Sequence, residues 1–350
     1  MLAQNRDRPV SVGLLALPES TPTALYGLYE VFNSVGAAWS ELTGEPPAGP
    51  AMDARIVAER REPFACALGL PITPHAALGD ELRPDVVVAT DLSLNPQQDP
   101  RGRWPAASAW LRRQYDRGAI VASVCTGSVL LADAGLLEHR EATTHWSAAA
   151  LFATYFPNVT LRPERILSLD GPEQRIVTSG GAASWEDLAL YLVARLCGGT
   201  EAARVAKLFV LGDRSEGQLP FAMPDRPRRH DDAVVARCQE WLADHYAAAD
   251  AVAGMLARSG LTARTFSRRF RAATGHAPLD YVQALRIEEA KQLLESTGEP
   301  ADAIGRLVGY EDPAFFRRLF KRRTGTTPAR YRQRFQSVGK PPRGGKAEHP

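Results

Sequence analysis

The chain has 350 residues, 45% of them apolar and 23% charged, which is the composition of a folded soluble protein of about two domains. These values exclude a collagen-like, coiled-coil or wholly disordered chain, and no stretch approaches the roughly 18 consecutive apolar residues that a membrane helix needs. The net charge of +2 is unevenly divided, because residues 1–230 carry 22 Lys and Arg against 26 Asp and Glu, whereas residues 231–336 carry 17 against 13.

The N-terminal sequence and the cysteines indicate the cellular compartment. The polar start, MLAQNRDRP, lacks the apolar core of a signal peptide. The four cysteines lie far apart and form no C-x-x-C pair, which favours free thiols in a reducing compartment over a zinc site or a disulfide framework. We therefore expect a cytoplasmic protein with no membrane segment, no metal site and no cofactor.

Residues 9–220 alternate short β-branched runs with amphipathic segments, a pattern typical of a parallel sheet covered by helices. The expected strands are 10–17, 54–58, 86–89, 119–124 and 175–178. The expected helices are 24–38, 106–117, 128–134, 147–155, 184–197 and 201–209. The pattern predicts an α/β domain over residues 9–220.

One segment of this domain carries possible chemistry. The apolar run GAIVASV leads into Cys125, Thr126 and Gly127, and the helical sequence SVLLADAGLL follows. A sharp turn between a strand and a helix would lift Cys125 above the sheet and aim it at a helix N-terminus, where a thiolate is favoured. This geometry can build a nucleophile.

The elbow resembles that of the PfpI-type, glutamine-amidotransferase-like proteins, whose α/β domain is flavodoxin-like. The segments ATTHW at 142–146 and VTSGGAASWEDLALYLVARLCG at 178–199 resemble, more narrowly, the version fused to AraC domains in GlxA-type transcriptional regulators. Protease-like members of the superfamily place histidine directly after the cysteine, where this chain has Thr126. Isonitrile-hydratase-like members pair Cys-Thr-Gly with an aspartate, and Ala24 occupies that position here, with Glu30 following Gly27.

The resemblance therefore leaves the acid–base set incomplete, so we predict no catalytic residue and no enzymatic activity. A cleft without such a set is better suited to holding a ligand. We hypothesise a sensor pocket for a small-molecule effector, lined by Glu30, Cys125, Thr126 and His145. The alternative is a cysteine-dependent hydratase or amidase that carries a DNA-binding module.

A proline-rich stretch separates this domain from the rest of the chain. LPFAMPDRPRRH at 219–230 has three prolines, each of which lacks an amide donor, so we expect an extended linker at 221–230. Helical sequence alone follows over 231–336. The end of the chain has no apolar residue after Val338 apart from one alanine, so we expect residues 337–350 to be disordered.

Residues 231–336 contain an internal repeat with an offset of fifty residues. Seven residues of the first copy recur in the second; they are Phe266, Arg268, Phe270, Thr274, Gly275, Pro278 and Tyr281, matched by Phe316, Arg318, Phe320, Thr324, Gly325, Pro328 and Tyr331. In each copy a short helix ending in glycine precedes the phenylalanine pair. This order of helix, glycine turn and second helix predicts a helix-turn-helix unit in each copy.

The second helix of each unit has an apolar and a cationic face. Its phenylalanines are four residues apart and share the buried face, which places Arg268 or Arg318 on the opposite side. Arginine there can bind guanine bidentately or neutralise phosphate, as a major-groove reader requires. The expected DNA-facing residues are Thr262, Arg264, Thr265, Arg268 and Arg271 in the first copy, and Arg317, Arg318, Lys321 and Arg322 in the second.

The helix expected at 278–295 spans roughly 27 Å, close to the ~34 Å between successive major-groove faces. Both reading helices can therefore contact one side of a duplex. Residues 231–336 resemble an AraC-type DNA-binding domain, most closely in GYEDPAFFRRLFKRRTGTTPARYR. The resemblance implies binding to double-stranded promoter or operator DNA, a homodimer, and contact with RNA polymerase. A nucleoid-type protein that binds DNA by charge alone is the remaining alternative.

Overall fold

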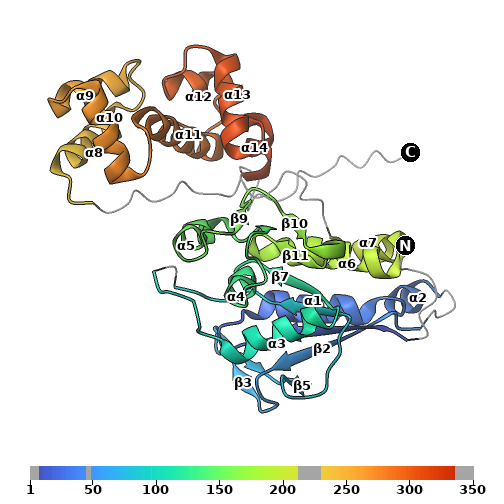
Figure 1. The fold of residues 1–350 in the computed structure, drawn as a ribbon. Coiled ribbons are helices and arrows are strands. Elements are labelled where there is room, and N and C mark those ends of the chain that lie inside the picture. The colour runs from blue at the N-terminus through green and yellow to red at the C-terminus, as the bar shows by residue number, and fades with distance from the viewer. Residues whose placement is uncertain (1–7, 45–48, 96, 212–229, 336–350) are drawn as a thin grey trace, which may run out of the picture. The chain divides into compact units, whose positions relative to one another are not determined.

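The computed structural model describes residues 8–44, 49–95, 97–211 and 230–335 (Figure 1). The chain divides into two compact units, Met1–Gln218 and Leu219–Pro350. The linker expected at 221–230 lies outside the described residues apart from His230, and the tail at 337–350 lies outside them entirely. In the described ranges, no helix is both long enough and apolar enough to cross a membrane.

The N-terminal unit is built on a seven-stranded sheet in the order β10-β11-β7-β6-β1-β2-β5. These strands are β1 Val10–Leu15, β2 Met52–Ala58, β5 Ala76–Ala77, β6 Val86–Ala89, β7 Ile120–Val124, β10 Leu167–Asp170 and β11 Ile176–Ser179. All neighbours are parallel except β10 and β11, which are antiparallel. The predicted α/β fold is confirmed. One edge strand, β10, was not expected from the sequence; its four residues, LSLD, alternate apolar and polar side chains, and it pairs antiparallel with β11.

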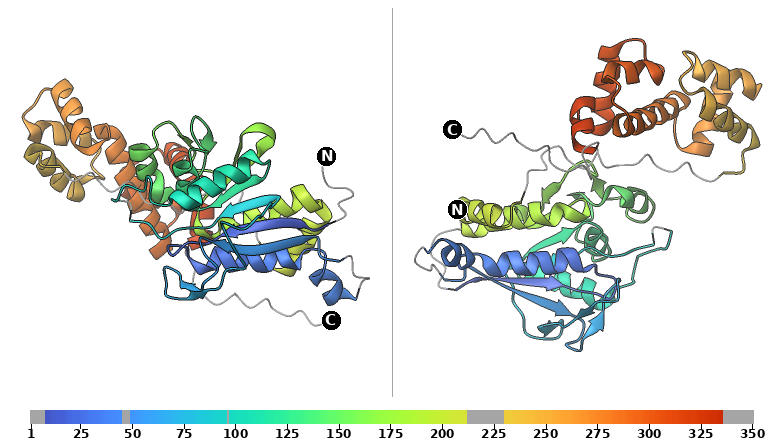
Figure 2. Two further views of the ribbon diagram at one scale, coloured as in Figure 1. Left: turned by 60° about the horizontal axis from the view of Figure 1, so that its bottom comes forward. Right: turned by 180° about the vertical axis from the view of Figure 1, so that it is seen from behind.

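Two layers of helices cover the sheet, as Figure 2 shows from two sides. One layer holds α1 Pro22–Ser34, α6 Trp185–Cys197 and α7 Gly199–Leu208, and the other holds α3 Pro105–Asp116, α4 Gly127–Asp133 and α5 Ala149–Tyr155. Alternate residues of one strand point to the two layers: Val86 and Val88 join the first apolar cluster, whereas Val87 joins the second. Both faces are buried, which explains the unbroken apolar runs of the central strands.

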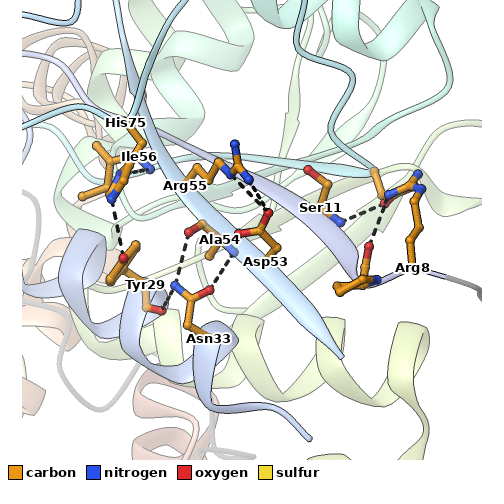
Figure 3. A network of polar contacts seen from close by, with 11 residues as sticks. Arg8, Ser11, Tyr29, Asn33, Asp53, Ala54, Arg55, Ile56 and His75 are labelled. Atoms are coloured by element: carbon orange, nitrogen blue, oxygen red, sulfur yellow. Dashed lines mark hydrogen bonds and ion pairs between the residues drawn. The ribbon is translucent and has the colours of Figure 1, made fainter. Parts of the chain in front are cut away.

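Smaller elements complete the unit. They are α2 Ala38–Thr43, the hairpin of β3 Phe64–Ala65 with β4 Pro71–Ile72, the parallel pair of β8 Glu141–Ala142 with β9 Thr160–Leu161, and 3-10 turns at Trp146–Ala148, Pro172–Gln174 and Ala182–Ser184. The expected helix at 24–38 ends earlier, at Ser34, because Gly36 has φ 83°. Asn33 fastens α1 to the sheet, since its side chain accepts from Ala54 N (2.9 Å) and donates to Ala54 O (3.2 Å) (Figure 3).

The C-terminal unit is all-helical over its described residues. Its helices are α8 Ala233–His245, α9 Ala251–Ser259, α10 Ala263–Thr274, α11 Pro278–Ser296, α12 Ala301–Leu307, α13 Pro313–Thr324 and α14 Pro328–Phe335. α9 with α10, and α12 with α13, form the two expected helix-turn-helix units. α11 joins them.

The two copies agree in their hydrogen bonds as well as in sequence. In the first, the Thr274 hydroxyl donates to Phe270 O (2.8 Å) and accepts from His276 N (3.2 Å). In the second, Thr324 makes the same two bonds with Phe320 O (2.9 Å) and Thr326 N (3.4 Å). In each copy these bonds lie where the second helix of the unit ends; these second helices, α10 and α13, are called the reading helices below.

Within the C-terminal unit, a buried arginine on α11 links the two helix-turn-helix units. Arg286 is 8% exposed and donates to three backbone carbonyls, Tyr246 O (2.6 Å), Ala248 O (2.7 Å) and Gly309 O (2.9 Å). The first two lie in the α8–α9 connection and the third in the turn between α12 and α13. That turn needs glycine, because a Cβ on Gly309 would lie 2.4 Å from Ala247 O.

Replacing Arg286 by Met should destabilise the C-terminal unit by about 3 kcal/mol, because three buried carbonyls lose their charged donor. Hydrogen exchange of the full chain, followed by mass spectrometry, should then show faster exchange in peptides from α9 to α13. Arg306→Met is the control, since the side chain of Arg306 is exposed on α12 and has no hydrogen bond or ion pair within the described residues. Equal protection in wild type and Arg286→Met would contradict this role.

Candidate functional site

Cys125 lies at a strained elbow between β7 and α4 (Figure 1). Its φ is 55°, a left-handed conformation that is costly for a residue with a side chain. The backbone is held there by Cys125 N donating to Ser179 O (2.9 Å) and by the hydroxyl of Ser128 donating to Cys125 O (2.9 Å). Gly127 allows α4 to begin close to β6, because a Cβ there would lie 2.4 Å from Ala89 O.

The thiol of Cys125 is buried and protonated at neutral pH. It is 6% exposed, and burial, followed by the negative charge of Asp91, raises its pKa to about 12. The amide and hydroxyl of Thr126 act in the opposite direction but do not outweigh burial. The expectation that the helix N-terminus favours a thiolate here is therefore wrong, because the apolar surroundings disfavour the charged form more strongly.

Asp91, which follows β6, is the carboxyl group whose charge acts on the thiol. The side chain is 6% exposed and burial raises its pKa. One carboxyl oxygen accepts from the Thr21 hydroxyl, and the other, Oδ1, is buried without a hydrogen-bond partner among the described residues. Asp91 is not among the pocket residues predicted from the sequence. The available signal was an acidic residue directly after a buried strand, at the sheet edge where the elbow also lies.

The other three predicted pocket residues have different surroundings. Thr126 lies beside the thiol, and its hydroxyl also donates to Leu92 O (2.6 Å) and accepts from Leu92 N (2.8 Å). His145 is half-buried, its Nδ1 contacts the Ser147 hydroxyl (2.6 Å), and burial lowers its pKa, so the ring is neutral near pH 7. Glu30 is exposed on α1 and has no hydrogen bond or ion pair within the described ranges.

The reading helices expose the cationic faces expected from the sequence. Eight of the nine predicted residues are exposed and Thr265 is half-buried; the eight are Thr262, Arg264, Arg268, Arg271, Arg317, Arg318, Lys321 and Arg322. Thr262 caps α10, because its hydroxyl accepts from Thr265 N (3.4 Å). Arg317 and Arg318 approach Asp302 (3.7 Å) and Asp312 (3.9 Å) but keep 56% and 70% of their side chains exposed.

Each reading helix also carries an arginine that contacts other helices of the unit, and the sequence pattern does not distinguish it from the exposed arginines. Arg269 pairs with Asp232 (2.5 Å) and so fastens α10 to α8. Arg323 donates to Asp280 (3.1 Å) and Gln283 (3.2 Å) at the start of α11. The second reading helix also exposes Phe315, at 40%, where the first carries Thr265.

Two family models match separate parts of the chain. The model of the DJ-1/PfpI family matches residues 51–195, and that of a helix-turn-helix domain matches residues 255–334. The transcriptional regulator CdhR of Pseudomonas aeruginosa is 31% identical over 244 residues, covering 65% of this chain and 67% of its own. The chain belongs to the AraC-type regulators with a DJ-1/PfpI domain.

A second curated regulator and one solved structure are also similar to this chain. The transcriptional regulator GlxA of Rhizobium meliloti is 29% identical over 231 residues, which are 65% of this chain and 70% of its own. A solved structure of a putative transcriptional regulator from Vibrio parahaemolyticus has a TM-score of 0.49 and 20% identity, and covers 58% of this chain and 100% of its own. The predicted AraC-type, PfpI-like family is confirmed.

Asp91→Asn should make Cys125 of this regulator more reactive, because it removes the negative charge that helps to raise the thiol pKa. We expect roughly threefold faster alkylation by iodoacetamide at pH 8.5, measured by peptide mass spectrometry, with the thiol still slower than a free cysteine because burial remains. Glu30→Gln is the matched control and should leave the rate unchanged. Wild-type Cys125 that reacts as fast as a free thiol would contradict this account.

Proposed function

We propose that the protein is a sequence-specific transcriptional regulator of the cytoplasm that responds to a small-molecule effector. Its N-terminal domain senses the effector and dimerises, and it performs no catalysis. The observation that carries the DNA-binding part is the exposed arginine face that occurs twice, on α10 and on α13. RNA polymerase is a further proposed partner, and no cofactor is required.

The two reading helices would occupy successive major grooves of one duplex. α11 has 19 residues, which corresponds to roughly 28 Å of helix, near the distance between successive major-groove faces. Contacts with α11 would set the spacing before DNA is bound: the Phe270 ring of α10 packs against Tyr281 at 5.4 Å, and Arg323 of α13 donates to Asp280 and Gln283. A pre-set spacing lowers the entropic cost of binding.

The chemistry of the elbow supports sensing over catalysis. A thiol with a pKa of about 12 supplies few thiolates at neutral pH, and the Nδ1 of His145 already contacts Ser147. The alternative, a cysteine-dependent hydratase or amidase with a DNA-binding module, requires an activated thiolate. Asp91 Oδ1 supports ligand binding, because a buried acceptor without a partner favours a donor group brought by an effector.

The proposed sensor pocket contains Glu30, Cys125, Thr126 and His145, with Asp91 added. An effector bound there would shift the population between two arrangements of the DNA-binding domains in the dimer. It can do so only in proportion to its difference in affinity for the two arrangements. A site that binds the effector equally well in both arrangements would not act as a sensor.

Arg268→Ala and Arg318→Ala should each weaken operator binding by about 1–3 kcal/mol, because each removes a contact to a base or a phosphate. Operator fragments would first be selected from genomic duplexes with the purified full chain at about 150 mM salt, and the affinities then measured by fluorescence anisotropy. Specific binding should exceed nonspecific binding by about a thousandfold. A ratio of that size would exclude a nucleoid-type protein that binds DNA by charge alone.

Arg237→Ala is the control for this experiment. Arg237 is exposed on α8, outside both reading helices, so its loss removes the same charge without removing a base contact. We expect its effect to be less than about threefold, the size of a general electrostatic contribution. Equal losses in all three variants would show that binding depends on charge alone.

A further inference from the structure

A cavity of about 410 Å³ lies at the amino-terminal edge of the sheet in the N-terminal unit. Its lining includes Pro84 before β6 and Ile120 at the start of β7, so it lies at the opposite end of β7 from Cys125. A second hollow of about 180 Å³ shares three of its lining residues, Arg83, Gln114 and Arg117. The larger cavity falls within the volume range of small-molecule sites, ~300–1,000 Å³.

The lining of the cavity is cationic. It contains five arginines and two acids; they are Arg8, Arg83, Arg117, Arg175 and Arg195, and Asp85 and Glu173. Arg8 pairs with Asp85 (2.9 Å), whose carboxylate also accepts from Ser11 N (Figure 3). Within the described ranges, none of the other four guanidinium groups pairs with a carboxylate. The cavity therefore has an excess of positive charge that no acid of its own neutralises.

Two of these arginines are held in place by the backbone around them. Arg175 donates to Tyr115 O (2.8 Å) and lies over the Tyr115 ring at 4.4 Å. Arg195 donates to Gln174 O (2.7 Å) and Glu173 O (2.6 Å), in a turn where both acceptor residues have positive φ. Both side chains are half-buried, so part of the entropic cost of ordering them is met before an anion binds.

Buried polar atoms beside the arginines lack partners. Gln114 of α3 lines both hollows and is 2% exposed; its Nε2 donates to Leu82 O (3.3 Å), but its Oε1 has no partner among the described residues. Trp110 Nε1, in the lining of the smaller hollow, is also buried and unpartnered there. Such atoms destabilise the folded chain unless a bound molecule satisfies them.

We propose that this cavity binds a small organic carboxylate that also carries a hydroxyl group. The carboxylate takes its hydrogen bonds from the free guanidinium groups of Arg83 and Arg117, with Arg175 and Arg195 adding positive charge. The hydroxyl donates to Gln114 Oε1. This site is separate from the Cys125 elbow and does not depend on the proposed function there.

The test is isothermal titration calorimetry of the full chain with malate, succinate and inorganic phosphate. Malate should bind saturably, at one molecule per chain, and more tightly than succinate, which has the same carboxylates but no hydroxyl. The double variant Arg83→Gln, Arg117→Gln should weaken malate binding by about tenfold or more. Both residues are exposed and unpaired within the described ranges, so the variant should keep the wild-type thermal midpoint.

Two further variants isolate the parts of the site. Gln114→Leu should remove the preference for malate over succinate, because it removes the acceptor. Arg60→Gln, which removes an exposed arginine after β2 that lines neither hollow, should leave malate binding unchanged.

Several results would overturn the proposal. They are no saturable binding of malate, equal malate binding by the double variant and the wild type, and binding of phosphate alone. A change in the sedimentation of the anion-free double variant would instead assign this surface to a subunit interface, and would also overturn the proposal.

Discussion

The geometry of the DNA-binding unit depends on the guanidinium group of Arg286. Burying a charge is expensive, and here three backbone carbonyls and the ring of Tyr310, at 5.1 Å, offset that cost. The carbonyls belong to two connections that are far apart in the sequence. A turn in one helix-turn-helix unit and the loop before the other are therefore fixed to the same helix. Arg286 therefore links the two helix-turn-helix units through α11.

The N-terminal domain separates its chemistry between the two ends of its strands. At the carboxyl ends, burial raises the pKa of both Cys125 and Asp91, and the charge of Asp91 raises that of the thiol further. At the amino ends, the five arginines in the lining of a cavity outnumber its two acids, Asp85 and Glu173. One end thus favours neutral donors and acceptors, whereas the other favours anions. The ligands proposed for the two ends of the sheet would therefore differ in charge.

Much of this architecture could be predicted from local sequence. β6 matches its predicted range, 86–89, because four apolar residues bounded by polar ones have few other uses. The repeat predicted both helix-turn-helix units and their exposed arginines. Asp91 could not be assigned to Cys125, since that requires knowing that β6 and β7 are neighbours. The local sequence does not show that Arg286 is buried, because its burial depends on a turn that lies 23 residues further along the chain.

The duplicated reader is similar in its two halves but not identical. Where α10 carries Thr265, α13 exposes Phe315, and the charged positions around them also differ. The two reading helices of a single chain therefore differ chemically, because one adds an exposed aromatic ring at a position where the other has a threonine. The recognition sequence of the chain would then be directional within each half-site. The orientation of that half-site relative to the start of transcription would carry information that its position alone does not.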